Sequence, residues 1–77
     1  MMKDLVSFIA GRLVDNPDAV TLSEREEGDT IVVELRVAKE DLGKVIGKQG
    51  RTAKAMRAVL AAASARLDKR SRLEIVE

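Results

Sequence analysis

The stretch "LGKVIGKQGRTAKAMR", from Leu42 to Arg57, decides how the rest of the chain is interpreted. Three glycines, at positions 43, 47 and 50, interrupt a pattern that is otherwise helical. Glycine costs a helix interior about 1 kcal/mol relative to alanine. The grouping therefore indicates that the backbone must turn sharply or come close to another group here, which glycine permits.

The last two glycines bracket Lys48 and Gln49 and stand where a long helical pattern begins. The first turn of a helix has unpaired N–H groups and a partial positive charge, so it favours a phosphate. Lys48, with Arg51 and Lys54 further along the chain, adds cations around the same place. These features together predict a clamp for a phosphate backbone.

Three other interpretations of this corner are open. An ordinary helix–turn–helix corner explains one glycine, but it requires neither the Gly-Lys-Gln-Gly arrangement nor its basic flanks. A nucleotide-triphosphate loop needs glycines one residue further apart and a hydroxyl after the lysine, where Gln49 stands. A DNA-reading helix–turn–helix would place the long helix in a major groove, but that helix carries mostly small alanines.

The composition restricts the remaining function classes. With 77 residues, the chain is expected to form one domain, 1–77, with a single small core. It has no cysteine and no histidine, and nothing near the glycines resembles a nucleophile–base pair, so we expect no catalytic residue, cofactor or metal site. The longest apolar run, "VLAAASA" at 59–65, is too short to span a bilayer. Asp4 and Arg12 interrupt the apolar core that a signal peptide needs, which predicts a soluble cytoplasmic protein.

The net charge of +1 conceals an asymmetry along the chain. Residues 1–37 carry a net charge of −4, whereas residues 43–72 carry +8. This separation predicts one electropositive face that could meet a polyanion. The alternative is a basic helix surface that is only solvated.

The hydrophobic periodicity predicts the order helix, strand, strand, helix, helix, strand. A hairpin turn is expected at residues 27–29, and a basic loop is expected to close the long helix. In chain order, the expected segments are a helix at 3–14, strands at 19–27 and 30–37, helices at 39–46 and 51–68, a loop at 68–71 and a strand at 72–77.

Each segment has an apolar face that we expect to be buried. Phe8, the single aromatic residue, is interpreted as core packing rather than as a stacking platform. Val32, Glu34 and Arg36 are expected to point outward from the second strand. The expected inward set is Leu5, Phe8, Ile9, Leu13, Val20, Leu22, Ile31, Val33, Leu35, Val37, Leu42, Val45, Ile46, Ala53, Met56, Leu60, Ala63, Leu67, Leu73 and Ile75.

The segment "VIGKQGRTA", from Val45 to Ala53, resembles the K-homology (KH) signature. That signature is an apolar pair, Gly-x-x-Gly, and an apolar residue three positions later. The element order resembles the type II KH arrangement, and nearly the whole chain is similar to the small bacterial single-KH-domain RNA-binding proteins (the KhpA type). The resemblance implies an α+β fold whose three-stranded sheet has three helices packed on one face.

The resemblance also implies a non-catalytic module that binds single-stranded RNA, as an RNA chaperone or a post-transcriptional regulator. Val45 and Ile46 would line the floor of the groove. Its opposite wall would come from the second strand, around residues 33–36, and from the loop at 68–71. The RNA-binding residues implied are Val45, Ile46, Gly47, Lys48, Gln49, Gly50, Arg51 and Lys54.

One departure from the family pattern is Ala53, where a larger aliphatic residue is frequent, so we expect a shallower groove. Without aromatic platforms, affinity must come mainly from phosphate contacts and must fall with added salt. The resemblance also implies a homodimer, or a heterodimer with a larger KH-containing protein, as a route to avidity. The competing hypothesis is an assembly subunit that works through its alanine-rich helix.

Overall fold

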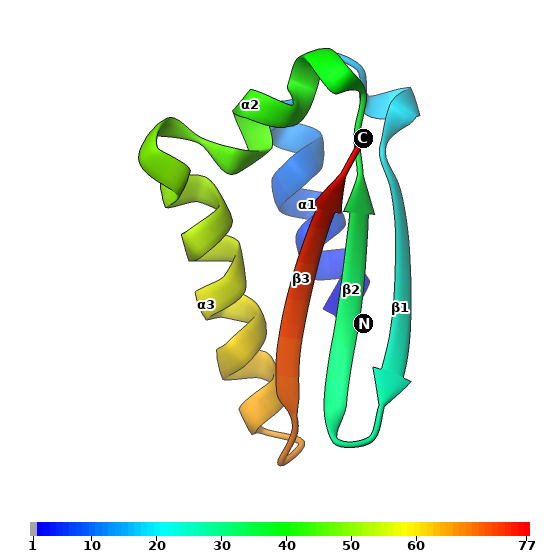
Figure 1. Ribbon diagram of the computed structural model, residues 1–77, viewed down its shortest axis with the longest axis vertical. Coiled ribbons are helices and arrows are strands. Elements are labelled where there is room, and N and C mark those ends of the chain that lie inside the picture. The colour runs from blue at the N-terminus through cyan, green and yellow to red at the C-terminus, as the bar shows by residue number, and fades with distance from the viewer. Residues whose placement is uncertain (1) are drawn as a thin grey trace.

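The computed structural model describes residues 2–77. The helices and strands follow one another in the order α1, β1, β2, α2, α3, β3, which confirms the predicted order and the α+β class (Figure 1). Short 3-10 turns lie at Pro17–Ala19, Lys39–Asp41 and Lys48–Gly50. The bounds are α1 Met2–Leu13, β1 Thr21–Glu27, β2 Thr30–Arg36, α2 Leu42–Ile46, α3 Arg51–Ala65 and β3 Arg70–Val76.

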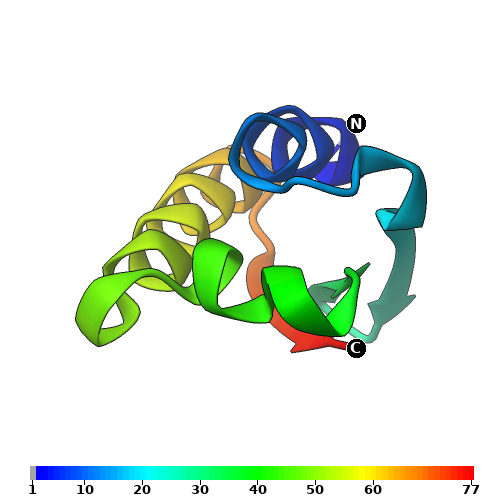
Figure 2. The same cartoon turned by 90° about the horizontal axis from the view of Figure 1, so that it is seen from above.

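The sheet has the order β1-β2-β3, with β2 in the middle. β1 pairs antiparallel with β2, as expected of a hairpin, and β3 pairs parallel with β2. The parallel pairing arises because α2 and α3 carry the chain back to the start of the sheet before β3 begins. α1 and α3 lie on one side of the sheet and leave the other face uncovered (Figures 1 and 2).

The core lies between α1, α3 and the covered face of the sheet. From β2 it takes Ile31, Val33 and Leu35, as the alternation of that strand predicts. The other buried members of the core are Met2, Val6, Ala10, Val37, Val45, Met56, Leu60 and Leu73.

The predicted buried face of α1 was wrong for three of its four residues, and only Ile9 packs against the core, partly buried. Leu5, Phe8 and Leu13 are exposed, Phe8 by 63%, while Met2, Val6 and Ala10 face the sheet. Residues four apart share one face of a helix, so Met2, Val6 and Ala10 lie together. The small side chain of Ala10 lets this face of α1 lie close to the sheet. α1 thus carries two apolar stripes, and periodicity alone did not show which of them the core takes.

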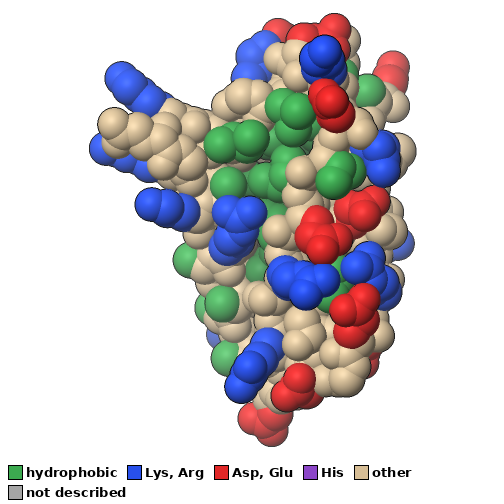
Figure 3. Space-filling view, viewed as in Figure 1, with side chains coloured by type: hydrophobic (Ala, Val, Ile, Leu, Met, Phe, Trp, Pro, Cys, Tyr) green, Lys and Arg blue, Asp and Glu red, His purple; other side chains and the backbone are tan. Residues whose placement is uncertain are grey.

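Val32 faces the uncovered side of the sheet, as predicted, yet its side chain is fully buried. It stands between Arg25 on β1 and Arg72 on β3, whose alkyl chains can cover it. Their guanidinium groups pair with glutamates: Arg25 Nε lies 2.7 Å from Glu27 Oε2, and Arg72 Nη2 lies 3.1 Å from Glu74 Oε2. The uncovered face therefore carries interleaved charges of both signs, as Figure 3 shows.

The end of α3 and the start of β3 also differ from the prediction. The segment 68–71 is not wholly a loop, because Arg70 and Ser71 pair with Thr30 and Ile31 on β2. The helix ends earlier than expected, since Asp68 has a left-handed φ of 57°. None of the helices within residues 2–77 is long and apolar enough to cross a membrane.

Candidate nucleic-acid interface

The four residues Gly47–Gly50, here called the glycine loop, join α2 to α3. Gly47 has φ 79° and ψ 171° and donates its N–H to the carbonyl oxygen of Gly43 over 2.9 Å. Gln49 and Gly50 both adopt left-handed conformations, with φ of 58° and 74°. α3 then begins at Arg51. The sequence therefore predicted the place of this corner correctly.

The two glycines of the loop are needed for different reasons. A Cβ atom at Gly47 would lie 2.2 Å from Thr52 Oγ1 and 2.9 Å from the Thr52 backbone nitrogen, so a side chain cannot fit there. A Cβ atom at Gly50 would meet nothing within 4 Å, but the positive φ favours glycine. Gly47 thus permits a close approach between the loop and α3, and Gly50 permits the turn into the helix.

Two of the four amides in the loop are bonded within the protein. Gly47 donates to Gly43, and Gly50 donates to the carbonyl oxygen of Gly47 over 3.1 Å. Lys48 and Gln49 are the first two residues of the 3-10 turn Lys48–Gly50, where backbone N–H groups have no acceptor within their own turn. Their side chains are exposed, and Gln49 Oε1 accepts a hydrogen bond from Arg51 Nη2 over 3.3 Å. The loop can therefore offer two backbone donors to an anion.

The nine basic residues of the segment 43–72 divide into paired and unpaired cations. Lys44, Lys69 and Arg72 form ion pairs with acidic residues of the protein. The others have no acidic partner within residues 2–77, and Figure 3 shows basic side chains gathered on the projecting corner of the molecule. These unpaired cations are Lys48, Arg51, Lys54, Arg57, Arg66 and Arg70.

The apolar pair before the loop is split between core and surface. The side chain of Val45 is fully buried in the core, whereas that of Ile46 is 40% exposed. Ala53 is also buried. Of these three residues, only Ile46 offers substantial apolar surface to a ligand. Figure 3 shows further apolar side chains between the projecting corner and the strands.

The expected opposite wall of the groove was misplaced. β2 is the middle strand, and its Val33 and Leu35 side chains are buried, so they cannot face a ligand. The edge strand beside α3 is β3. The segment 68–71 lies at the opposite end of α3 from the glycine loop (Figure 1). Parallel strands tend to be joined by a right-handed crossover, and this rule could have indicated β3 as the strand beside α3.

Sequence reasoning also missed Asp41, which lies directly before α2. Its carboxylate is fully buried and accepts three hydrogen bonds: Oδ1 from the Asp15 amide over 3.2 Å, and Oδ2 from the amide and the side chain of Asn16 over 3.0 and 3.1 Å. Burial alone would raise the pKa of Asp41, but these hydrogen bonds and the nearby Lys44 charge outweigh it and lower the pKa.

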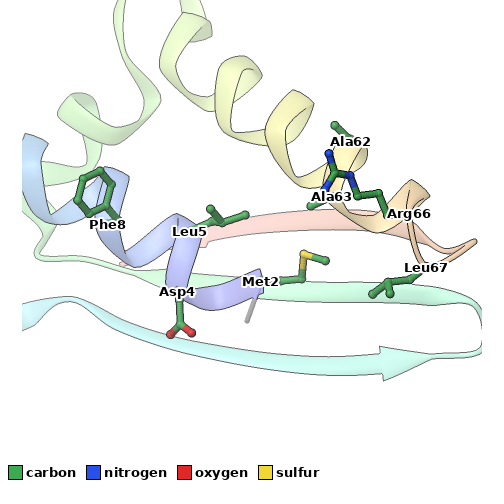
Figure 4. Close-up of a pocket in the computed structure, with 8 residues that line it drawn as sticks. All are labelled: Met2, Asp4, Leu5, Phe8, Ala62, Ala63, Arg66 and Leu67. Carbon is green, nitrogen blue, oxygen red and sulfur yellow. The ribbon is translucent and has the colours of Figure 1, made fainter.

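A second concave region lies between α1 and α3, away from the glycine loop (Figure 4). This hollow, the α1–α3 groove, has a volume of about 600 Å³. The Arg12 guanidinium carbon lies 4.6 Å from the centre of the exposed Phe8 ring. The groove is lined by Met2, Asp4, Leu5, Phe8, Ala62, Ala63, Arg66 and Leu67. Within residues 2–77, no group of three or more Asp or Glu side chains is arranged to hold a metal ion.

The element order, the mixed three-stranded sheet and the Gly-x-x-Gly corner between two helices define a type II KH domain. The chain matches the model of the KhpA/KhpB KH domain family over residues 3–75, and it belongs to that family. KH domains of this family are binding modules rather than enzymes, in agreement with the sequence-based expectation.

Several curated relatives resemble the chain over nearly its full length. It is 53% identical to the RNA-binding protein KhpA of Halalkalibacterium halodurans over 76 residues, which cover 99% of this chain and 100% of the relative. It is 51% identical to the RNA-binding protein KhpA of Aquifex aeolicus, with 99% and 96% covered. It is 52% identical to the protein of the same name from Caldanaerobacter subterraneus, with 97% and 100% covered.

Proposed function

We propose that the chain is a cytoplasmic, non-catalytic module that binds single-stranded RNA and clamps its phosphate backbone at the glycine loop. One observation carries the proposal: the loop combines two backbone amides at the start of a helical turn with cations that have no acidic partner among the described residues. The names of the relatives, which are RNA-binding proteins, support RNA as the polyanion. A module of this kind would act as an RNA chaperone or a post-transcriptional regulator.

Each part of the interface has a distinct task in this proposal. The amides of Lys48 and Gln49 donate hydrogen bonds to phosphate oxygens. Lys48, Arg51 and Lys54 add positive charge along the same strand of RNA. Ile46 packs against a base, while Val45 anchors α2 in the core. Gly47 and Gly50 let the RNA backbone approach the loop.

The proposed contacts predict weak, salt-dependent binding. The only aromatic residue, Phe8, lies on the α1–α3 groove, so base stacking worth roughly 1–3 kcal/mol per base is missing from the interface. Three phosphate contacts, from Lys48, Arg51 and Lys54, imply a slope of about −2 in a plot of log affinity against log salt concentration. Replacing Lys54 by alanine should make this slope shallower by about 0.7.

The central test is the double variant Lys48→Asp/Gln49→Asp. Both side chains are exposed, and aspartate tolerates the left-handed conformation at position 49, so the fold should remain. A matched control, Lys3→Asp/Ser7→Asp, makes the same charge change at two exposed positions of α1. Fluorescence anisotropy with a labelled single-stranded oligonucleotide measures affinity, and far-UV circular dichroism checks the fold.

We expect the loop variant to lose binding by more than tenfold, because two aspartates place negative charge beside the phosphates. The control variant should lose far less, since its charges lie on another element. Equal affinity of the two variants would show that general charge, rather than the glycine loop, attracts the RNA.

The α1–α3 groove favours a second function, assembly with another KH-containing chain. An apolar hollow with an exposed aromatic residue and an arginine at its edge has the composition of a protein–protein contact. We propose that a homodimer, or a heterodimer with a larger KH-containing protein, forms through this side of the alanine-rich α3. Phe8→Ser should weaken self-association in sedimentation equilibrium, whereas the loop variant should leave it unchanged.

A further inference from the structure

α2 is a short helix with a large effect on the glycine loop. It comprises five residues, Leu42–Ile46, and a helix of this length does not hold itself together in water. Its direction must therefore be fixed by contacts at its ends and along its buried side. The glycine loop follows α2 without any intervening residue, so a rotation of α2 would swing the loop and the first turn of α3.

The beginning of α2 is fixed by a contact that helix capping does not explain. Asp41 occupies the N-cap position, where a carboxylate commonly accepts a hydrogen bond from the first turn of its own helix. Here its side chain makes no such bond. Both of its oxygens instead accept hydrogen bonds from Asp15 and Asn16, in the connection between α1 and β1, 26 and 25 residues earlier in the chain.

Lys44 makes a second link between α2 and the same connection. It lies one turn after Asp41, its Nζ forms an ion pair with the Asp15 carboxylate, and it lies 3.6 Å from Asp41 Oδ1. The side chains of Asp41, directly before α2, and Lys44, within α2, thus both reach the α1–β1 connection. Together they restrict both the position and the rotation of the helix.

We propose that Asp41 is a positioning residue for RNA binding. Its hydrogen bonds join the α1–β1 connection to the start of α2 and thereby fix the orientation of the glycine loop. This inference rests on the proposed function of the loop. Asp41 itself is buried and makes no contact with the RNA. Its effect is to hold the amides of Lys48 and Gln49 in one orientation before the RNA arrives, so that binding requires little reordering.

Asp41→Asn tests the inference with little change in volume. The amide oxygen can serve the two donors of Asn16, but its NH2 group then faces the Asp15 N–H, so at least one hydrogen bond is lost. We expect RNA affinity to fall roughly threefold to thirtyfold, the range seen for substitutions remote from a ligand. The backbone amide resonances of residues 47–50 should shift in the free protein.

Asn16→Ala is the milder variant and removes only the side-chain hydrogen bond to Asp41. It should move the same loop resonances in the same direction by a smaller amount, and it keeps the test available if Asp41→Asn does not fold. Val6→Ala, a core truncation on α1, is the control for stability. It should lower the unfolding temperature while leaving both the loop resonances and RNA affinity unchanged.

The outcomes separate this inference from the function on which it rests. If Lys48→Asp/Gln49→Asp binds RNA as tightly as the wild type, the loop is not the RNA site. If that variant loses binding while folded Asp41→Asn and Asn16→Ala keep wild-type affinity and unmoved loop resonances, the loop is the site and Asp41 does not position it. A loss of affinity in Val6→Ala equal to that in Asp41→Asn would likewise refute positioning, because stability alone would then explain both.

Discussion

Replacing Gly47 by alanine should destabilise the fold much more than any other glycine-to-alanine change in the corner. Its φ of 79° with ψ of 171° is a conformation that is almost confined to glycine and costs roughly 1–3 kcal/mol for other residues. The new Cβ would also lie 2.7 Å from Thr52 Cβ and 2.9 Å from the Thr52 backbone nitrogen. Overpacking of this kind costs about 1–3 kcal/mol more.

The sum, at least about 2 kcal/mol, is large for a domain whose total stability is about 4–12 kcal/mol at usual values per residue. It corresponds to a fall in the unfolding temperature of about 8 °C or more. Gly43→Ala is the matched control, because Gly43 lies within α2 and its added Cβ would meet nothing within 4 Å. Alanine there should stabilise the helix by up to about 1 kcal/mol.

Urea denaturation followed by circular dichroism measures the free energy of unfolding of both variants. Thr52→Ala in the Gly47→Ala background should restore only part of the loss. It removes the contact with Oγ1 but leaves the contacts with Cβ and the backbone nitrogen. If Gly47→Ala and Gly43→Ala were equally stable, the close approach between the glycine loop and α3 would not exist in solution.

Three further predictions concern the core, the groove and the buried carboxylate. Leu60→Ala should lower the free energy of unfolding by about 2–5 kcal/mol in urea denaturation, because the Leu60 side chain is almost fully buried. Phe8→Ser should change that free energy by less than about 0.5 kcal/mol, since the ring is largely exposed. Hydrogen bonds lower the pKa of Asp41, so its contribution to stability is complete above the ordinary aspartate pKa and is lost as the pH falls through the lowered value. Acid titration of Asp41→Asn should therefore show a smaller loss of stability over that range than the wild type.

Local patterns predicted the elements because each is encoded within a few residues. The alternation of β2 identified both the strand and its buried side, since Ile31, Val33 and Leu35 all enter the core. The glycine grouping located the corner for the same reason. The sequence of α1 alone does not determine which side of the helix is buried, because the helix has two apolar stripes. The choice between them depends on how α1 packs against the sheet and α3.

The errors at the candidate site have the same origin. The groove wall was assigned to β2 because the parallel insertion of β3 beside it depends on how α2 and α3 return the chain. Val32 points outward as predicted, but its burial could not be foreseen because its cover comes from Arg25 and Arg72, which are distant in sequence. Asp41 was overlooked because its partners lie 25 and 26 residues away. Hydrophobic periodicity along the sequence does not show which residues distant in the chain pair with one another.

The uncovered face of the sheet limits where RNA can bind. Arg25, Arg36 and Arg72 on this face are paired with glutamates, so most of its positive charge is already neutralised and it attracts a polyanion weakly. The unpaired cations belong to the loop, to α3 and the residue directly after it, and to the first residue of β3. In the proposed interface the contacts at the loop are few and none is aromatic, so RNA affinity depends on how little the loop has to reorder. The close approach of Gly47 to Thr52 fixes one side of the loop, and Asp41 fixes α2 on the other. In the proposed interface, the loss of either constraint should therefore lower RNA affinity.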